Sequence, residues 1–351
     1  MADNSSFQGT ERHFTATAAH SVEDVRRAKR EWSSRLLRNA RRASPRALFA
    51  AVSSNPDLNV VGVGVGEKIT GNRHTGVMAL RFLVRAKLPE SRIVATHMLP
   101  RLIDGIPTDV EEVGIFRKFA AATTPSAVVN PQTRIRPAQP GCSIGFADPT
   151  GQFLMAGTFG ALVRDPAGTY ILSNNHVLAD EGQLPAGSPI FQPGLLDNGN
   201  PATDGIARLA RFIPLQANAA NTVDCAIAEV IDPAQVSKAI LEMGPPAGVA
   251  AAQIHMAVQK SGRTTGFTAG QVASIDTDVS VQYETGTFTF ESQIVVVGMN
   301  GSQFSDNGDS GSLIVERNSN AAVGLLFAGS ASHTLANHIS QVLAALNVTL
   351  A

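Results

Sequence analysis

The sequence predicts a mostly β protein in which a helical segment and a small α/β domain precede a larger β-rich domain. Three observations support this prediction. From residue 141 onward, short apolar stretches alternate with turn residues, and no helical period separates them. Residues 55–118 combine strand patterns with turns, and residues 21–43 repeat apolar side chains every three or four positions. Short strands in close succession, without helices between them, favour a sandwich or a pair of barrels over a parallel sheet.

Residues 21–43 predict an amphipathic helix. Ser21 is a suitable N-cap, and the acids of the first turn and the arginines of the last turn suit the helix dipole. Ser44 and Pro45 end this helix and begin a short second helix over residues 46–52. The apolar face of the first helix comprises Val25, Ala28, Trp32, Leu36 and Ala40.

The same segment is strongly basic. Between residues 22 and 46, nine lysines and arginines stand against three acids, a local charge of about +6. Three readings are open: a helix packed on its own protein with a solvated basic face, a docking surface for a regulatory protein partner, or a nucleic-acid contact. Nucleic acid is the least favoured, because the whole chain carries a formal net charge of −1.

The small α/β domain begins with a glycine-rich strand. Residues 59–66 alternate valine and glycine, as the start of a dinucleotide-binding fingerprint does. The third glycine of that fingerprint would fall at Glu67, and no helix start follows, so the stretch predicts a strand. Further strands are expected at 77–84 and 109–114, with a turn over 99–106. The expected domains are 1–54 (helical segment), 55–118 (small α/β domain), 119–140 (linker rich in Ala, Thr and Pro) and 141–351 (β-rich domain).

The β-rich domain divides into short predicted strands. The turn Asp165-Pro-Ala-Gly168 joins the first two as a hairpin. A helical pattern over residues 339–346 ends the chain. The predicted strands are 157–164, 169–173, 206–213, 223–230, 271–275, 279–283, 287–290, 293–298, 312–316 and 322–327.

Composition predicts a soluble protein of a reducing compartment. Hydrophobic residues make up 44% and charged residues 16% of the 351 residues, as in ordered globular chains. A secreted protein of this size usually carries several disulfides, whereas only Cys142 and Cys225 occur here. One bridge between these two stays open. No signal peptide and no run of ~18 apolar residues is visible, so we expect a cytoplasmic protein that does not enter a membrane.

Three short segments carry the residue types that acyl transfer needs. His176 ends an apolar strand in NNHVL, Asp224 enters one in NTVDCAIA, and Ser310 lies in the turn of NGDSGSLIV. A serine hydroxyl becomes a good nucleophile when a neutral imidazole takes its proton. A buried carboxylate orients that imidazole and stabilises its charged form. The backbone N–H groups of Gly308 and Ser310 are the expected oxyanion donors, and a side chain at position 308 would crowd the approaching carbonyl.

These motifs, their order and their separations of 48 and 86 residues resemble those of trypsin-like (chymotrypsin-fold) serine proteases over residues 141–351. The resemblance implies two six-stranded antiparallel barrels, with His176 and Asp224 on the first barrel and Ser310 on the second. It also implies a serine endopeptidase that hydrolyses a protein or peptide substrate without a cofactor.

A closer resemblance covers roughly residues 56–345. The pattern VVGVGVG at 60–66, followed by IDGIPTDV at 103–110, is similar to that of bacterial, disulfide-poor proteases with a small N-terminal α/β domain. Plant narrow-leaf proteins are distantly similar. The alternative function is a protease fold used as a scaffold, or a partner-regulated protein with little or no turnover.

Two other aspartates and one other hydrolase fold fit the sequence less well. Asp204 lies in a turn and Asp232 lies past its strand, so Asp224 is preferred. An α/β-hydrolase needs glycine two residues after its nucleophile and an acid farther on, and position 312 is Ser312. The sequence contains neither HExxH nor a CxxC pair, so no metal site is expected.

The resemblance also assigns the substrate-binding residues. The residue six positions before the serine lies at the base of the specificity pocket in this family, and here it is Phe304. Phe327, Ala328 and Gly329 correspond to the pocket wall beside the substrate backbone. An aromatic base favours an apolar or small residue before the cut, not a basic one.

The resemblance connects Asp309 with activation. In secreted relatives the corresponding aspartate pairs with an N-terminal amine released by cleavage, and no such start precedes the first strand here. A buried, unpaired carboxylate is costly, so another donor is required. We expect an internal Arg, Lys or backbone amide and a constitutively active enzyme; ordering by a partner is the alternative.

Overall fold

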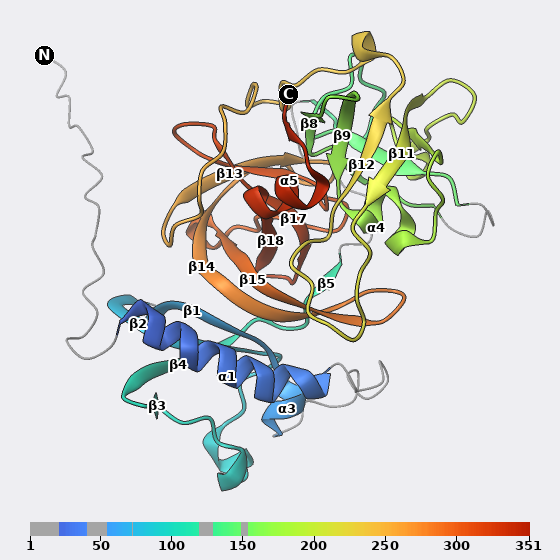
Figure 1. Ribbon diagram of the computed structural model, residues 1–351. Helices are drawn as coiled ribbons and strands as arrows, with labels where there is room; N and C mark the ends of the chain where they lie inside the picture. The colour runs from blue at the N-terminus through green and yellow to red at the C-terminus, as the bar shows by residue number, and fades with distance from the viewer. Residues whose placement is uncertain (1–20, 41–54, 72, 119–128, 149–153) are drawn as a thin grey trace, which may run out of the picture.

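The computed structural model describes residues 21–40, 55–71, 73–118, 129–148 and 154–351, without the side chains of 38–40. Two β-barrels stand side by side, and the N-terminal unit lies against the second of them (Figure 1). The predicted mostly β architecture with two antiparallel barrels is confirmed. The helix expected at 46–52 and part of the expected linker lie outside the described residues.

One stretch of chain, residues 157–164, closes the first barrel, because its two strands, β7 and β8, pair with different neighbours. β7 pairs with β6 and β8 pairs with β9, while only Phe159 and Gly160 separate β7 from β8. Both residues continue the ladders, since their N–H groups donate to the carbonyls of Cys142 and Leu172, each at 2.9 Å. β19 (Thr349–Leu350) extends β8. The barrel strands are β6 (Ser143–Phe146), β7 (Gly157–Thr158), β8 (Ala161–Arg164), β9 (Thr169–Ser173), β10 (Pro189–Phe191), β11 (Gly205–Phe212) and β12 (Ala226–Val230).

The second barrel is a ring of six antiparallel strands. Its order is β13-β16-β17-β18-β15-β14, and β13 also pairs with β14, which closes the ring. α5 (Ile339–Leu346) follows β18 as predicted, with Ile339, Val342 and Leu346 buried. The strands are β13 (Ala257–Gly262), β14 (Gly266–Gln282), β15 (Thr287–Gly298), β16 (Leu313–Glu316), β17 (Ala322–Gly329) and β18 (Thr334–His338).

Four predicted strands of this barrel are in fact two. Residues 271–275 and 279–283 were expected as separate strands, but β14 runs through both over 17 residues. β15 likewise spans both 287–290 and 293–298. The polar residues between them form bulges instead of turns: Asp276 and Ser292 have positive φ (53° and 57°), and the register shifts around Thr277. A bulge lets a long strand bend around a barrel without ending it.

The N-terminal unit continues the sheet of the second barrel. β1 pairs antiparallel with the second half of β14, from Gly62 opposite Val279 to Gly66 opposite Ser274. The alternating glycines permit this approach, since a Cβ at Gly64 would lie 2.5 Å from the hydroxyl of Thr277. The unit contains α1 (Val22–Ala40), α3 (Pro56–Asn59), β1 (Val60–Thr70), β2 (Arg73–Val84), β3 (Leu102–Ile103) and β4 (Ile106–Glu112), and β5 (Arg117–Lys118) leads out of it.

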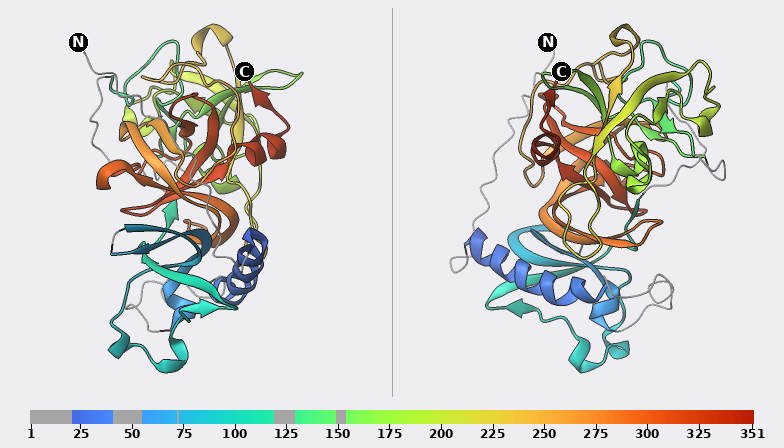
Figure 2. Two further views of the ribbon diagram at one scale, coloured as in Figure 1. Left: turned by 90° about the vertical axis from the view of Figure 1, so that its left-hand side faces the viewer. Right: turned by 45° about the vertical axis from the view of Figure 1, so that its right-hand side comes forward.

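Helix α1 packs on its own protein. Figure 2 shows it lying along one face of the N-terminal sheet. Ser21 caps it as predicted, because its hydroxyl accepts the N–H of Asp24 at 3.2 Å. Trp32 meets Phe82 of β2 edge to face at 5.4 Å. The buried face comprises Val25, Ala28, Leu36 and Leu37, which contact a cluster that includes Val63, Val65, Leu80 and Phe82.

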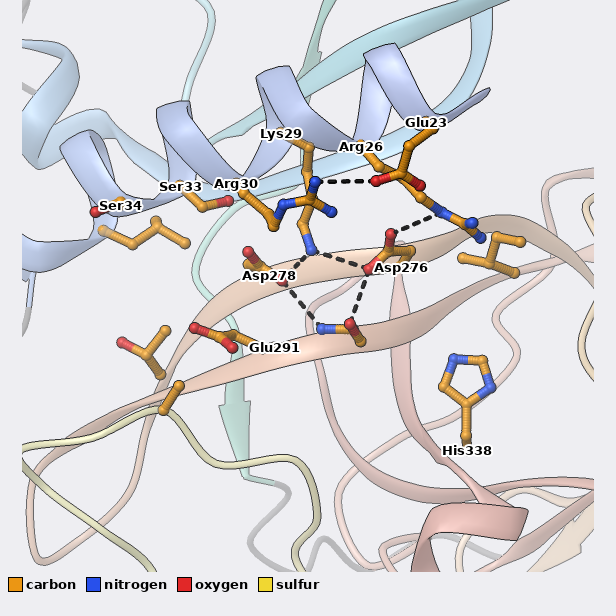
Figure 3. Close-up of a pocket in the computed structure, with 15 residues that line it drawn as sticks. Glu23, Arg26, Lys29, Arg30, Ser33, Ser34, Asp276, Asp278, Glu291 and His338 are labelled. Carbon is orange, nitrogen blue, oxygen red and sulfur yellow. Dashed lines mark hydrogen bonds and ion pairs between the residues drawn. The ribbon is translucent and has the colours of Figure 1, made fainter. Parts of the chain in front are cut away.

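Part of the basic charge of α1 is neutralised within the chain (Figure 3). The ammonium group of Lys29 lies 2.9 Å from a carboxylate oxygen of Asp276 and 2.5 Å from one of Asp278, both on β14. Arg26 also reaches Asp276, at 3.3 Å. A cavity of about 730 Å³ lies between these groups, and charged side chains from both sides line it.

The two cysteines form no disulfide. Cys142 and Cys225 are free and buried, and they lie in different apolar clusters. Burial raises the pKa of Cys142 to about 12. Among the described residues, no helix has the length and apolar character to span a bilayer.

The remaining helices are short. They are α4 (Asn175–Leu178), η1 (Glu90–Arg92), η2 (Ala95–His97), η3 (Asp180–Gly182), η4 (Leu195–Asp197), η5 (Pro233–Gln235) and η6 (Met299–Gly301).

Candidate active site

The three residues singled out by their motifs lie where the barrels meet. His176 sits on α4, directly after β9, and Asp224 lies two residues before β12. Ser310 lies three residues before β16 of the second barrel. All three are 0% exposed. The structure thus distributes them over the two barrels as the sequence motifs implied.

His176 and Asp224 form a close pair. Nδ1 of the imidazole lies 2.6 Å from Oδ2 of the carboxylate. The other oxygen, Oδ1, accepts the N–H of Asn175 at 2.7 Å. The backbone of Asp224 is held as well, because its N–H donates to Asn337 Oδ1 at 2.9 Å. Such a carboxylate places the imidazole proton on Nδ1 and leaves Nε2 as the basic nitrogen.

The fully buried carboxylate of Asp224 has several partners that favour its ionised form. Burial alone would raise its pKa, but the charge and hydrogen bond of His176, with hydrogen bonds from Tyr283 and Asn175, hold the pKa below its ordinary value. A carboxylate that remains an anion can stabilise an imidazolium during proton transfer.

Tyr283 is a component of the site that the sequence did not reveal. Its hydroxyl donates to Asp224 Oδ2 at 2.7 Å, and its ring meets the His176 ring edge to face at 5.8 Å. Burial, followed by the nearby charge of Asp224, raises the pKa of this phenol well above its ordinary value. Tyr283 ends a predicted strand, but no local pattern indicated that it crosses to the first barrel.

Ser310 lies in a turn that the first barrel holds from one side. Its carbonyl accepts the N–H of Thr158 at 2.8 Å, and the Thr158 hydroxyl donates to Gly308 O at 2.9 Å. The Ser310 hydroxyl donates to the carbonyl of Phe327 at 3.2 Å. Nε2 of His176 is buried and has no hydrogen-bond partner in the described part of the chain. The serine–histidine hydrogen bond is therefore not formed in this conformation.

The turn needs glycine on both sides of the serine. Gly308 and Gly311 have φ of 98° and 93°, where side chains are disfavoured. A Cβ at Gly308 would lie 2.5 Å from the Thr264 hydroxyl and 2.7 Å from Arg263 Nη1. Among the described residues, no backbone acceptor bonds the N–H of Gly308 or of Ser310. Both amides can therefore donate to an incoming oxygen.

Asp309 finds its donors inside the chain, as predicted. It is fully buried, and the ammonium group of Lys260, also buried, lies 3.3 Å from Oδ2. Burial lowers the pKa of Lys260, and the opposite charge of Asp309 counteracts that effect. Backbone N–H groups of Thr264, Thr265 and Asp306 donate to the carboxylate at 2.8, 3.1 and 3.0 Å. An internal lysine thus supplies the cation beside the buried carboxylate.

A second buried ion pair braces the same turn and was not anticipated. Arg263 is 0% exposed and bonds Asp197 through two nitrogens, at 2.6 Å from Nε and 2.5 Å from Nη2. The Ser143 hydroxyl donates to the same carboxylate at 2.5 Å. Because Asp197 and Ser143 belong to the first barrel, this pair links the barrels beside Gly308.

The predicted substrate-binding residues fall into two groups. Phe327, Ala328 and Gly329 lie on β17, and Phe327 contacts Ser310 through its carbonyl. Phe304 is 3% exposed and packs in a different apolar cluster, with Val258. Its carbonyl accepts the Thr268 hydroxyl at 2.7 Å. The structure therefore brings the β17 residues to Ser310 and places Phe304 within the second barrel.

A strand of the same chain already lies on this part of β17. β5 pairs antiparallel with it, Arg117 opposite Gly329 and Lys118 opposite Ala328. The Lys118 ammonium group lies 2.5 Å from Glu181 Oε1 and 3.2 Å from Glu284 Oε1. The edge expected to hold a substrate backbone is thus occupied.

Comparisons with known proteins identify relatives of the fold. The family model described as the Nal1 C-terminal domain matches residues 221–342, roughly a third of the chain. Comparison with curated proteins gave no match. A glutamic-acid-specific serine protease that binds substrate through a histidine triad is 18% identical, with a TM-score of 0.43, 61% of this chain and 100% of that chain covered.

Two further solved structures are similar to the same extent. Thermobifida fusca Protease A is 16% identical, with a TM-score of 0.42, covering 60% of this chain and 96% of that one. Cellulomonas bogoriensis chymotrypsin is 18% identical, with a TM-score of 0.41, covering 60% and 97%. Similarity at this level does not decide activity, so the function rests on the geometry of the site.

Proposed function

We propose that the protein is a serine endopeptidase with Ser310 as nucleophile, His176 as general base and Asp224 as the orienting acid. The observation that carries this proposal is the buried 2.6 Å pair of His176 and Asp224, which leaves Nε2 without a partner among the described residues, while the Ser310 turn is bonded to Thr158 of the same barrel. A structural histidine would have its second nitrogen bonded, since buried polar groups are normally satisfied.

The proposed reaction proceeds through an acyl-enzyme. The Ser310 hydroxyl rotates from the Phe327 carbonyl to His176 Nε2, which takes its proton as Oγ attacks the peptide carbonyl carbon. The N–H groups of Gly308 and Ser310 donate to the resulting oxyanion. The proton on Nε2 passes to the leaving amine, which departs. Water then attacks the acyl carbon as His176 takes one of its protons, and that proton passes to the Ser310 oxygen when the ester bond breaks.

The proposed substrate is an extended segment of a protein. An extended peptide adds to an exposed strand edge through main-chain hydrogen bonds, and β5 shows that residues 328–329 of β17 accept such a strand.

A fluorophosphonate probe, which labels only an activated serine, tests the proposal. We expect Ser310-dependent labelling of the full chain and none in Ser310→Ala. Ser302→Ala is the matched control, because Ser302 is an exposed serine on the second barrel. Absence of labelling in every form of the protein, together with no peptide hydrolysis, would favour the scaffold.

A partner-regulated enzyme is the second candidate, and β5 favours it. The three active-site residues are buried, the serine–histidine bond is unmade, and β5 covers the adjacent edge. In that case labelling is slow in the wild-type chain and becomes fast when β5 is displaced.

A further inference from the structure

Three potential metal ligands from separate segments converge away from Ser310. They are Glu67 on β1, His74 on β2 and His255, two residues before β13. Oε2 of Glu67 lies 3.0 Å from His74 Nδ1 and 2.7 Å from His255 Nε2. All three ligand atoms lie within 4.8 Å of one another. Two imidazole nitrogens thus approach one carboxylate oxygen.

The Glu67 carboxylate is buried, with its side chain 5% exposed. The N–H of Gly76 and the imidazoles of His74 and His255 surround it. A buried anion is stable only with a compensating cation or several donors.

Hydrogen bonds that involve backbone groups hold Glu67 and His255 in place. The N–H of Gly76, a glycine with φ of 74°, bonds Oε1 of Glu67 and leaves Oε2 to face the imidazoles. His255 has φ of 70°, a conformation rare for a residue with a side chain. Its N–H donates to Val272 O at 2.8 Å and its carbonyl accepts Gln271 Nε2 at 3.1 Å. Strained backbone of this kind persists where the surroundings enforce it, often at ligand sites.

We propose that Glu67, His74 and His255 bind one Zn²⁺ ion, which ties the β1–β2 hairpin to the second barrel. Two imidazole nitrogens and one carboxylate oxygen are a common zinc donor set, whereas Ca²⁺ and Mg²⁺ select oxygen ligands. Ligand atoms of a tetrahedron with bonds of about 2.05 Å lie about 3.3 Å apart, so the carboxylate oxygen needs to separate from the two imidazole nitrogens by about 0.3 and 0.6 Å. Water completes the tetrahedron on the solvent side, where the His74 side chain is 51% exposed.

The site is tested by Zn²⁺ binding to the full chain. Protein treated with a chelator and dialysed is titrated with Zn²⁺ in competition with a chromophoric chelator of micromolar affinity. We expect one Zn²⁺ per chain with a Kd of about 1 µM or lower. His255→Ala and Glu67→Gln should each weaken binding by more than about a hundredfold, since even groups behind a ligand contribute tenfold to a hundredfold.

His97→Ala is the matched control, because it removes a histidine from the same N-terminal unit that is not among the three ligands. It should bind Zn²⁺ as the wild-type chain does. The melting temperature is the second readout: Zn²⁺ should raise the Tm of the wild type by a few degrees and leave that of Glu67→Gln unchanged. Circular dichroism confirms that each variant is folded. Two results would show that the cluster holds only hydrogen bonds. One is a wild-type chain that takes up no Zn²⁺, and the other is Zn²⁺ binding by His255→Ala and Glu67→Gln that is as tight as that of the wild type.

Discussion

The hydroxyl of Tyr283 donates a hydrogen bond of 2.7 Å to Asp224 Oδ2, the oxygen that also faces Nδ1 of His176. Tyr283 follows the last residue of β14 in the second barrel, whereas Asp224 belongs to the first. The orientation of the Asp224 carboxylate therefore depends on how the two barrels are placed, and the β14–β15 turn contributes to the candidate active site.

Tyr283→Phe should lower kcat about tenfold while leaving KM nearly unchanged, because the ring still packs but one donor to the buried carboxylate is lost. Tyr283 acts as a positioning residue through Asp224. A carboxylate with one donor fewer is a stronger base and stabilises the imidazolium better, so the acid limb of the kcat/KM profile should move to higher pH. An unshifted profile with normal kcat would mean that Tyr283 only fills space.

Substitution of the predicted catalytic residues should abolish peptide hydrolysis. We expect Ser310→Ala and His176→Ala to lower kcat about 10⁴-fold or more, and Asp224→Asn to cost a similar amount because it favours the wrong imidazole tautomer. Steady-state hydrolysis of a peptide library measures this. Near-normal activity in any of the three variants would refute the assignment.

Lys118→Glu should increase the proposed peptidase activity. The substitution places a third carboxylate beside Glu181 and Glu284, so β5 is repelled from β17. We expect at least about a tenfold increase in hydrolysis of a small peptide, since breaking a buried ion pair shifts such an equilibrium by more than 1.4 kcal/mol.

Lys118→Arg is the control for this prediction, because it keeps the charge and should keep the wild-type rate. A synthetic peptide of residues 113–118 should inhibit the Lys118→Glu enzyme competitively. If Lys118→Glu is folded and Ser310-dependent but no faster than wild type, β5 does not restrain the site.

Lys260→Met should destabilise the protein and its active-site turn. It leaves the fully buried Asp309 without its cation, and breaking such a pair costs about 3–5 kcal/mol of unfolding free energy. Urea denaturation measures the loss. Lys260→Met with Asp309→Asn should recover part of that stability but not the activity. Equal stability of wild type and Lys260→Met would contradict the role of this pair.

Docking of α1 should weaken in acid. Burial alone would raise the pKa of Asp276, but the hydrogen bond and charge of Lys29, with Ser292 and Arg26, hold it below the ordinary value. A carboxyl with a lower pKa in the folded state stabilises the fold above its unfolded pKa, near 4, and that contribution is lost as pH falls through the folded pKa.

Lys29→Met should therefore cost about 2 kcal/mol of unfolding free energy at pH 7, and the difference from wild type should shrink as the pH falls below about 4. Arg27→Met is the control, since Arg27 is exposed and pairs only with Asp24 among the ion pairs described. A pH-independent difference for Lys29→Met would mean that its contribution is packing.

Local patterns were sufficient to predict much of the fold and to single out the residues of the candidate site. Turn residues between apolar stretches located most strands, because a strand's limits depend on its own residues and its turns. The glycines around Ser310 indicated a tight turn for the same reason, since a positive φ is a requirement of the local backbone. Asp309 was predicted to find an internal donor because a buried charge cannot stay unpaired.

Pairings between distant segments were decided by tertiary structure alone. β5 meets β17 across more than 200 residues, and Glu67 meets His255 across 188. Because the chain forms bulges at Asp276 and Ser292 and not turns, the four strands expected there are two in the structure. Local patterns state which side chains face inward and where the chain turns. Which edge a strand joins depends on barrel closure and on the whole set of competing edges, so β5, Tyr283 and the histidine cluster emerged only from the folded chain.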